Sequence, residues 1–178
     1  MAMFGNGFTE NSPPSVFSCL YQILNQKTMK NTFITLFNRD LNRLYKEIEA
    51  YTDEAILWQK AERITNSAGN LCLHVVGNLN EYIGRQIGQI PYQRNRPLEF
   101  SAMGISQKEL LTLIKNTQEV VEMALETMKN EHLSDKYPEN VMGYDMTVHY
   151  FLVHLNGHLN WHLGQINYHR RLLSTPAV

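Results

Sequence analysis

Apolar residues recur at spacings of three and four along four separate stretches of the chain, a pattern typical of helices that each bury one face. The stretches span about residues 29–51, 67–90, 106–128 and 146–173. No segment alternates convincingly between apolar and polar residues, as a half-buried strand would. The pattern therefore predicts an all-α protein built as a four-helix bundle.

Capping residues and prolines mark the ends of these predicted helices. Asn66 or Ser67 can cap the second helix, because each offers a side-chain acceptor to free backbone N–H groups. Ser106 and Glu109 form a capping box at the start of the third helix. Prolines interrupt the pattern in residues 91–105, which we expect to form a loop. Fully extended, this loop would reach about 50 Å, long enough to cross over and let the second and third helices run parallel.

The N-terminal part of the chain differs in composition from the rest. Residues 1–14 contain Gly, Asn, Ser and Pro and show no period, whereas residues 16–24 are apolar enough for a short helix or a packing arm. We expect residues 1–28 to be a partly loose N-terminal extension and residues 29–178 to form one domain of ordinary length. The pattern is equally compatible with residues 15–28 being a packed part of the fold.

The composition of the chain argues against binding to nucleic acid or a membrane and favours a cytoplasmic location. The chain has 16 basic and 17 acidic side chains and a formal net charge of −1, so it lacks the field that collects nucleic acid or anionic lipid. Two cysteines without a CxxC spacing favour a reducing cytoplasm. No apolar run approaches about 18 residues, so no membrane-spanning helix is expected. We therefore expect a cytoplasmic protein that binds neither nucleic acid nor a membrane.

Candidate chemistry comes from the histidines. Four of the seven lie within sixteen residues of the fourth predicted helix: His154, His158, His162 and His169. His158 and His162 are four positions apart, so their side chains lie on one helix face, with Cβ atoms about 5–6 Å apart, and can bind the same ion. His154 and His162 are separated by about 12 Å of helix rise. One of these two is therefore expected to play a supporting or structural role.

A third ligand must come from another helix, and His74 is the best candidate. It lies in the apolar middle of the second predicted helix, where a charged imidazolium would be unfavourable to bury. Asn70 and Asn78 lie one turn to either side of His74 on the same face, and a metal with bound water would supply partners for this polar stripe. Spacing alone leaves two alternatives open: histidines that merely form hydrogen bonds in the core, and a bis-histidine haem pocket.

Three segments resemble motifs of the DinB/YfiT-like superfamily. Residues 157–166 (GHLNWHLGQI) resemble its last-helix motif, in which two histidines separated by three residues are followed by x-Gly-Gln-Ile, and residues 167–171 resemble one bacterial branch. Residues 70–78 resemble the second-helix histidine motif, and residues 94–100 resemble the following loop of an uncharacterised subfamily. The resemblance covers about residues 29–173.

The resemblance implies a four-helix bundle with a long crossover between helices two and three. It also implies a divalent metal, commonly zinc or nickel, bound by three histidines. The corresponding residues in this sequence are His74, His158 and His162. The family often has histidine and arginine around the second ligand, where this chain has Trp161 and Leu163. The polar surroundings of the metal are therefore expected to differ, and no relative's substrate carries over.

Three neutral imidazoles leave a metal ion its double charge and open positions, as in catalytic zinc sites. The resemblance implies a metal-dependent enzyme acting on a small molecule, either a hydrolase or a thiol S-transferase that uses a low-molecular-weight thiol. Gln165 can orient a ligand or bound water, or form an interhelix hydrogen bond. Glu81 is a candidate general base. Arg94 and Arg96 can bind an anionic substrate, or instead form a local ion pair with Glu99 in a solvated loop.

The alternative function is non-catalytic. The chain would then be a stress-associated bundle whose metal is structural, with a fourth protein ligand such as His154 closing the site. The resemblance implies a homodimer, because relatives often pair through long helix faces, and Tyr45, Trp58 and Tyr150 can line such a face. A DNA-binding role is suggested only by the family name, and the near-neutral charge argues against it.

Overall fold

The computed structural model describes residues 16–60 and 62–174, and within these residues the regular structure is helical, with no β-strand. The expected loose segment, residues 1–14, lies outside the described residues. None of the described helices is long and apolar enough to cross a bilayer. The expectation of an all-α fold is confirmed.

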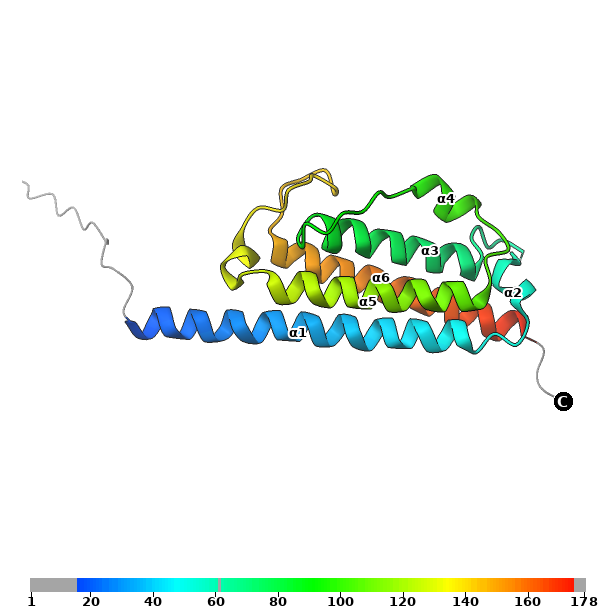
Figure 1. Ribbon diagram of the computed structural model, residues 1–178, viewed down its shortest axis with the longest axis horizontal. Coiled ribbons are helices and arrows are strands. Elements are labelled where there is room, and N and C mark those ends of the chain that lie inside the picture. The colour runs from blue at the N-terminus through cyan, green and yellow to red at the C-terminus, as the bar shows by residue number, and fades with distance from the viewer. Residues whose placement is uncertain (1–15, 61, 175–178) are drawn as a thin grey trace, which may run out of the picture.

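Four long helices form a bundle (Figure 1). They are α1 (Val16–Glu49), α3 (Ala68–Leu79) with its continuation η1 (Asn80–Arg85), α5 (Gln107–Thr127) and α6 (Val148–Leu173). Both α1 and α3 pack against α5 and α6. In Figure 1, α1 and α6 run toward the end of the bundle that carries the short helix α2 (Glu54–Trp58), whereas α3 and α5 run away from it. The second and third long helices are therefore parallel, and the segment between them crosses over, as expected.

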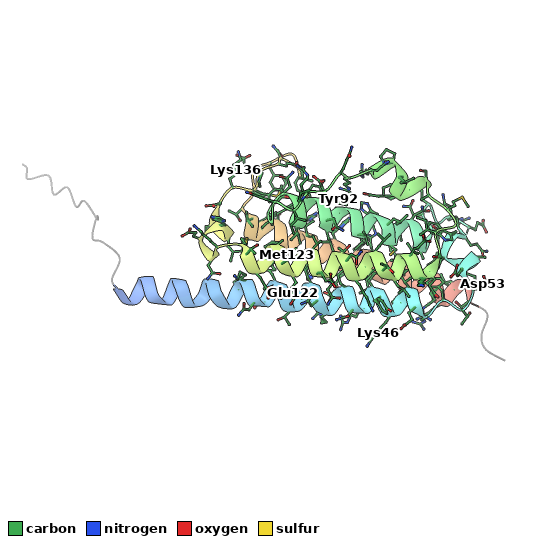
Figure 2. The ribbon with its side chains drawn as sticks, in the orientation of Figure 1. Lys46, Asp53, Tyr92, Glu122, Met123 and Lys136 are labelled. Carbon is green, nitrogen blue, oxygen red and sulfur yellow. The ribbon has the colours of Figure 1, made fainter. Side chains whose placement is uncertain are left out.

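The core is a continuous set of apolar side chains contributed by all four long helices. Those that are completely buried include Phe37, Leu41, Leu44, Ile48, Ile83, Ile114, Leu125, Leu152 and Leu159. Full burial of one such side chain contributes about 1.5–3 kcal/mol relative to exposure. Charged side chains of the bundle surface point the other way, as Lys46 on α1 does in Figure 2.

One buried carboxylate links α1 to α6. Asp40 on α1 is fully buried and accepts hydrogen bonds from Arg39 Nε at 2.8 Å and from Asn160 Nδ2 on α6 at 2.7 Å. Asn156 Nδ2, one turn earlier on α6, donates to the same carboxylate at 3.3 Å. Asn156 and Asn160 flank His158 in the sequence, so these hydrogen bonds fix the rotation of α6 about its own axis.

The ends of several helices differ from the sequence expectation. The first helix begins at Val16 and not at Met29, because no glycine or proline interrupts residues 16–28. The second helix ends as a π-helix at Arg85 and does not reach Ile90. The connection over residues 52–66 contains α2, which forms because the Asp53 side chain caps it by accepting a hydrogen bond from Ala55 N at 2.9 Å.

The crossover carries a short helix, so the expectation of a plain loop over residues 91–105 is wrong. Helix α4 (Arg96–Ser101) begins after Asn95, whose side-chain oxygen accepts a hydrogen bond from Leu98 N at 3.2 Å. Pro97 suits this first turn, because the N–H that proline lacks has no partner within the helix there. The proline expected to interrupt helical structure therefore lies inside a helix.

The side chain of Asn70 on α3 binds the backbone of the α4 segment. Asn70 Nδ2 on α3 donates hydrogen bonds to the backbone oxygens of Glu99, at 3.1 Å, and of Ala102, at 2.9 Å. Beyond α4, Trp58 Nε1 donates to the backbone oxygen of Ile105 at 3.1 Å. Trp58 is only 9% exposed, so the expectation that it lines a dimer interface is wrong.

Candidate metal centre

The three histidines singled out in the sequence meet between α3 and α6. His158 Nε2 lies 3.3 Å from His74 Nε2 and 3.1 Å from His162 Nε2. The three rings stand nearly at right angles to one another, with interplanar angles of 77°, 88° and 87°. All three ligand atoms lie within 4.8 Å of each other. The residues from two distant stretches of chain therefore converge on one point.

The spacing of the nitrogen atoms suits a tetrahedral ion. Metal–nitrogen bonds of about 2.0–2.1 Å at tetrahedral angles place neighbouring nitrogens about 3.3–3.4 Å apart. The two measured separations, 3.3 and 3.1 Å, are close to this edge length. Neutral imidazole nitrogens are also among the donors that zinc, nickel and copper prefer. The residues present thus fit a divalent transition metal.

The hydrogen bonds behind two of the rings turn their Nε2 lone pairs inward. His74 Nδ1–H donates to Glu99 Oε2 at 2.9 Å, and His162 Nδ1–H donates to Gln165 Oε1 at 2.7 Å. The Nε2 atoms of both rings are then acceptors, and both face His158 Nε2. His158 Nε2–H can donate to only one of them at full strength. A cation at the common point would satisfy all three nitrogens.

Burial favours the neutral form of the two ligand imidazoles on α6, those of His158 and His162. Desolvation, with smaller contributions from His162 and His74, lowers the pKa of His158 to about 3. Desolvation also lowers the pKa of His162, although the hydrogen bond to Gln165 acts in the opposite direction. Neutral imidazole is the form that binds a metal, so no proton has to be displaced from these two rings near neutral pH.

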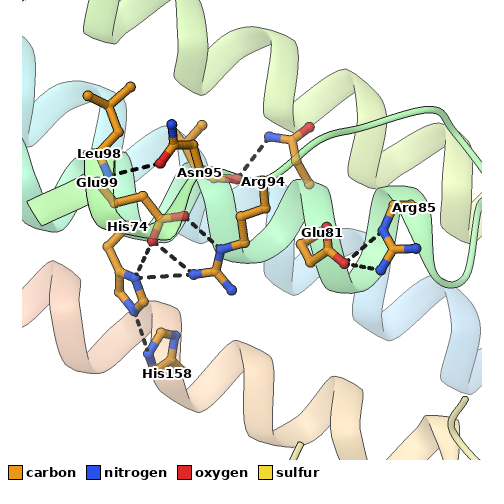
Figure 3. Close-up of polar contacts among 10 residues, drawn as sticks. His74, Glu81, Arg85, Arg94, Asn95, Leu98, Glu99 and His158 are labelled. Carbon is orange, nitrogen blue, oxygen red and sulfur yellow. Dashed lines mark hydrogen bonds and ion pairs between the residues drawn. The ribbon is translucent and has the colours of Figure 1, made fainter. Parts of the chain in front are cut away.

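A buried ion pair lies directly behind His74 (Figure 3). Arg94 Nε donates to Glu99 Oε1 at 2.7 Å, and Arg94 Nη2 donates to Glu99 Oε2 at 2.9 Å. Burial alone raises the pKa of Glu99, but the hydrogen bonds from His74 and Arg94 outweigh it and hold that pKa below its ordinary value. An ionised carboxylate behind a ligand histidine fixes the tautomer of the ring and increases the basicity of the ligand.

Gly77 makes room for this carboxylate. A Cβ atom at Gly77, on the turn after His74, would overlap the Glu99 side chain, with Glu99 Cδ only 2.9 Å away. Real Cβ atoms do not approach that closely, so any other residue at this position would displace Glu99. The glycine therefore serves the placement of the carboxylate and, through it, of His74.

The Glu99–His74 contact was missed in the sequence. The expectation paired Glu99 with arginine in a solvated loop, and the pair with Arg94 exists, but the Arg94 side chain is only 11% exposed and the pair is buried. The available signal was the capping residue Asn95, with Pro97 in the first helical turn. That signal would have predicted α4, but not its position over α3.

The other candidate polar residues are distributed around the three histidines without joining them. Glu81 is held by Arg85, whose Nε donates to Glu81 Oε1 at 2.7 Å, and Figure 3 shows this pair away from the imidazoles. Asn70 is used by the backbone of α4. Asn78 is buried, and its Oδ1 has no partner in the part of the chain that the structure describes. The ring of His154 stacks on that of His158 at 6.2 Å.

A pocket of about 330 Å³ adjoins the imidazoles. Its lining includes two of the three histidines, together with Asn78, Tyr82, Arg94, Arg96, Phe151 and His154. None of the residues that line it is acidic. Arg96 lies with its guanidinium 5.8 Å from the centre of the Phe100 ring. A hollow of about 480 Å³ beside Tyr144 and Tyr150 contains none of the three histidines.

Comparison with known proteins assigns the chain to a family. A family model described as the DinB superfamily matches residues 36–166, a span that includes all three histidines and the buried ion pair. Comparison with curated proteins found no match, and comparison with solved structures found none either. The family match covers well over half of the chain and agrees with the helical fold and the histidine cluster. The chain belongs to the DinB superfamily.

Proposed function

We propose that this protein is a metal-dependent enzyme, of the thiol S-transferase or hydrolase type, that acts on a small molecule. A divalent ion, zinc or nickel, would be held by His74, His158 and His162. The observation that carries the proposal is the convergence of three imidazoles beside a pocket. Within the described residues, the group of side chains able to share an ion contains only these three.

The donor set favours catalysis over a sealed structural site. Three neutral ligands leave the double charge of the ion uncompensated and at least one position open, which is the arrangement of catalytic zinc. Bound there, the ion would lower the pKa of a water toward about 7 or hold the thiolate of a low-molecular-weight thiol. A structural site would need a fourth protein ligand, and the expected one, His154, stacks on His158 and does not join the group.

Other residues of the chain would orient the ligand histidines or bind the substrate. Glu99 and Gln165 orient the ligand rings through their hydrogen bonds to His74 and His162. Arg96 supplies positive charge to a pocket without carboxylates, which favours a substrate carrying an anionic group. The amide oxygen of Asn78, which has no partner among the described residues, offers an acceptor to a substrate donor. Glu81 can act as a general base only if its ion pair with Arg85 opens.

The volume of the pocket limits the size of the substrate. About 330 Å³ lies at the lower end of the range of about 300–1,000 Å³ for small-molecule sites, so we propose a compact substrate.

Cys72 is a free, buried thiol whose pKa is raised to about 12 by burial. A free thiol in the core agrees with a cytoplasmic location, which we propose from cysteine usage.

The experiment that tests the proposal compares turnover with metal coordination. The metal-loaded protein is assayed for transfer of a small thiol to an electrophilic acceptor and for hydrolysis of small esters and amides. Cobalt-substituted protein reports thiol binding through a new sulfur-to-metal absorption band. We expect turnover that disappears on chelation and in His158→Ala, and that survives in His154→Ala. A tightly bound metal that admits neither thiol nor water would contradict catalysis and support the structural alternative.

A further inference from the structure

A second pocket lies at the end of the bundle that carries α2, between the turn before α3 and the last turns of α6 (Figure 1). Its volume is about 340 Å³, and its lining shares no residue with the pocket that His74 and His158 line. It is here called the α2-end pocket, and its lining includes Arg63, Ile64, Gln165, Tyr168, His169 and Leu172. The proposed function assigns no ligand to it.

One wall of the α2-end pocket is fixed by hydrogen bonds. His169 is only 3% exposed, and both of its ring nitrogens have partners. Its Nδ1 lies 2.9 Å from Tyr51 Oη, and its Nε2–H donates to the backbone oxygen of Gln59 at 2.8 Å. The imidazole therefore has no free hydrogen-bonding atom to offer, and recognition of a ligand falls to the other side chains of the pocket.

The charge of the α2-end pocket favours an anionic ligand. Arg63 is exposed and forms no ion pair with the described part of the chain, whereas Arg94 and Arg170 are paired with Glu99 and Glu47. None of the residues that line the pocket is acidic. A guanidinium binds carboxylate oxygens through its fork of N–H donors. Since the pocket has a single arginine, a monoanion matches its charge better than a dianionic phosphate does.

The exposed apolar surface of the same pocket favours a ligand with a flat apolar body. Tyr168 and Leu172 lie one turn apart on α6 and are each 66% exposed. Ile64, from the turn before α3, is 36% exposed. A ligand that covers these side chains removes their apolar surface from water, and a ring can stack on Tyr168. A volume of about 340 Å³ is near the lower limit for small-molecule sites, so the body is compact.

We propose that the α2-end pocket binds a small aromatic carboxylate, with the carboxylate at Arg63 and the ring on Tyr168. Gln165 supplies a second donor to the carboxylate. Its Oε1 accepts the hydrogen bond from His162 Nδ1 at 2.7 Å, whereas its Nε2 has no hydrogen-bond partner among the residues that the structure describes. The two oxygens of a carboxylate can accept from the guanidinium and from this free N–H together.

The same glutamine links the α2-end pocket to the histidine cluster. A carboxylate on Gln165 Nε2 would hold Oε1 toward His162 Nδ1, which keeps His162 Nε2 an acceptor facing the common point of the three rings. Ligand and metal would therefore strengthen each other's binding by the same factor. This link rests on the proposed metal site, whereas binding of the ligand itself does not.

Titration of the full chain with phenylacetate, followed by chemical shifts in NMR spectra, tests the pocket. We expect saturable binding with a dissociation constant of about 5 mM or lower, before and after treatment with a chelator. Persistence after chelation separates this pocket from a carboxylate bound to the metal. Absence of saturable binding at about 50 mM would overturn the proposal.

Two analogues of the probe separate charge from ring. Phenylacetamide keeps the ring and the size but lacks the charge, and acetate keeps the charge but lacks the ring. Each should bind at least about 10-fold more weakly than phenylacetate. Equal binding of the amide would overturn the role of Arg63, and equal binding of acetate would overturn the role of the apolar surface.

Two arginine variants locate the ligand. Arg63→Gln keeps an exposed polar side chain but removes the charge, so we expect about 10-fold weaker binding of phenylacetate. Arg96→Gln is the matched control, because Arg96 is also exposed and also lies near a ring, that of Phe100, but lines the other pocket. This variant should bind as the wild type does. Weaker binding in Arg96→Gln, with none in Arg63→Gln, would place the probe in the other pocket and overturn the proposal.

A second pair of variants tests the stacking. Tyr168→Ala should weaken binding at least about 3-fold, whereas Trp161→Ala should not, although Trp161 is 69% exposed on the same helix. Both side chains are largely exposed, so helical circular dichroism should be unchanged in both variants. Equal weakening in the two variants would show that phenylacetate adheres to exposed rings in general and would overturn the proposal.

Chelator competition in the presence of phenylacetate tests the link to the histidines. A saturating concentration of the probe should raise the metal affinity of the wild type about 5-fold, and the same concentration should have less effect in Arg63→Gln. An unchanged metal affinity would overturn the link through Gln165. Binding of the probe by a chain that takes up no metal would refute the proposed function and still support the α2-end pocket.

Discussion

Glu99 Oε2 lies 2.9 Å from His74 Nδ1, and this hydrogen bond joins a helix of the crossover to the middle of α3. The carboxylate is ionised and buried, and Arg94 holds it from the other side. His74 is therefore oriented before any metal arrives, because its Nδ1 is committed to donation and its Nε2 to acceptance. Histidines that bind metals almost always have their second ring nitrogen held by such a partner.

Substitution of Glu99 by glutamine should weaken metal binding while preserving the fold. The amide in Glu99→Gln would retain the size of the side chain but remove the charge behind His74, and loss of such a partner reduces metal affinity by about 10–100-fold. Competition with a chelator of known affinity measures the change.

Glu81→Gln is the matched control for that experiment. Glu81 is also a buried helical carboxylate paired with an arginine, but it contacts Arg85 and none of the three imidazoles. The metal affinity of the Glu81→Gln variant should equal that of the wild type. Equal affinity in the Glu99 variant as well would show that the carboxylate has no influence on the ligand.

Gly77→Ala should destabilise the protein, against the usual effect of such a change in a helix. Alanine normally stabilises a helix interior by roughly 0.5–1 kcal/mol relative to glycine. Here the added Cβ would meet the Glu99 side chain and displace the carboxylate from His74. Thermal unfolding and chelator competition should both show a loss, and an increase in Tm with unchanged metal affinity would contradict this account.

Metal removal should lower the thermal stability of the bundle. An ion that binds only the folded chain, present at 100 to 1,000 times its dissociation constant, adds about 3–4 kcal/mol to the free energy of unfolding. For a chain of this size that corresponds to a fall in Tm of roughly 5–15 °C on chelation. The same treatment should leave the Tm of His158→Ala unchanged, because that variant has no complete ligand set to empty.

The buried carboxylate of Asp40 should make stability depend on acid pH. Burial raises the pKa of Asp40, but hydrogen bonds from Arg39, Asn160 and Asn156 outweigh it and lower that pKa below its ordinary value. Because the carboxyl has a lower pKa in the folded chain than in the unfolded chain, its ionisation stabilises the fold. This contribution is complete at pH values above the pKa in the unfolded chain, about 3.9, and is lost as the pH falls through the pKa in the folded chain. Asp40→Asn should therefore be less stable by about 1–3 kcal/mol at pH 7, and this difference should shrink below about pH 4.

Urea unfolding at several pH values measures that difference, and Asp145→Asn provides the control. Asp145 pairs with Lys136 at 2.9 Å, but both side chains are 67% exposed. An exposed pair contributes at most about 1 kcal/mol, so this variant should stay close to the wild type at every pH. A pH-independent gap between the wild type and Asp40→Asn would argue against an ionised carboxylate in the core.

The sequence was sufficient for the architecture because the pattern of each long helix is local. The three-and-four spacing of apolar residues depends only on helix geometry, and the capping box at Ser106 was found where the pattern placed it. The meeting of His158 and His162 followed from their spacing, and that of His74 with them from the family motifs. These features need no knowledge of how the crossover packs.

The parts that sequence reasoning missed depend on contacts between distant segments. Helix α4 is held over α3 by hydrogen bonds from Asn70 to backbone oxygens, a pairing that no periodicity reveals. Glu99 reaches His74 only because α4 lies there and because Gly77 leaves space. Trp58 looked like surface in a connecting segment, but its ring packs over Gly69. Each of these is a tertiary relationship in which local pattern carries little information.

Elemental analysis of the purified protein and of single histidine variants tests the central claim most directly. The account predicts about one divalent ion per chain in the wild type and in His154→Ala, and loss of that ion in His74→Ala, His158→Ala and His162→Ala, with helical circular dichroism intact throughout. Full metal content in any of those three variants would contradict it, because the remaining two imidazoles would then be binding the ion without the convergence described here.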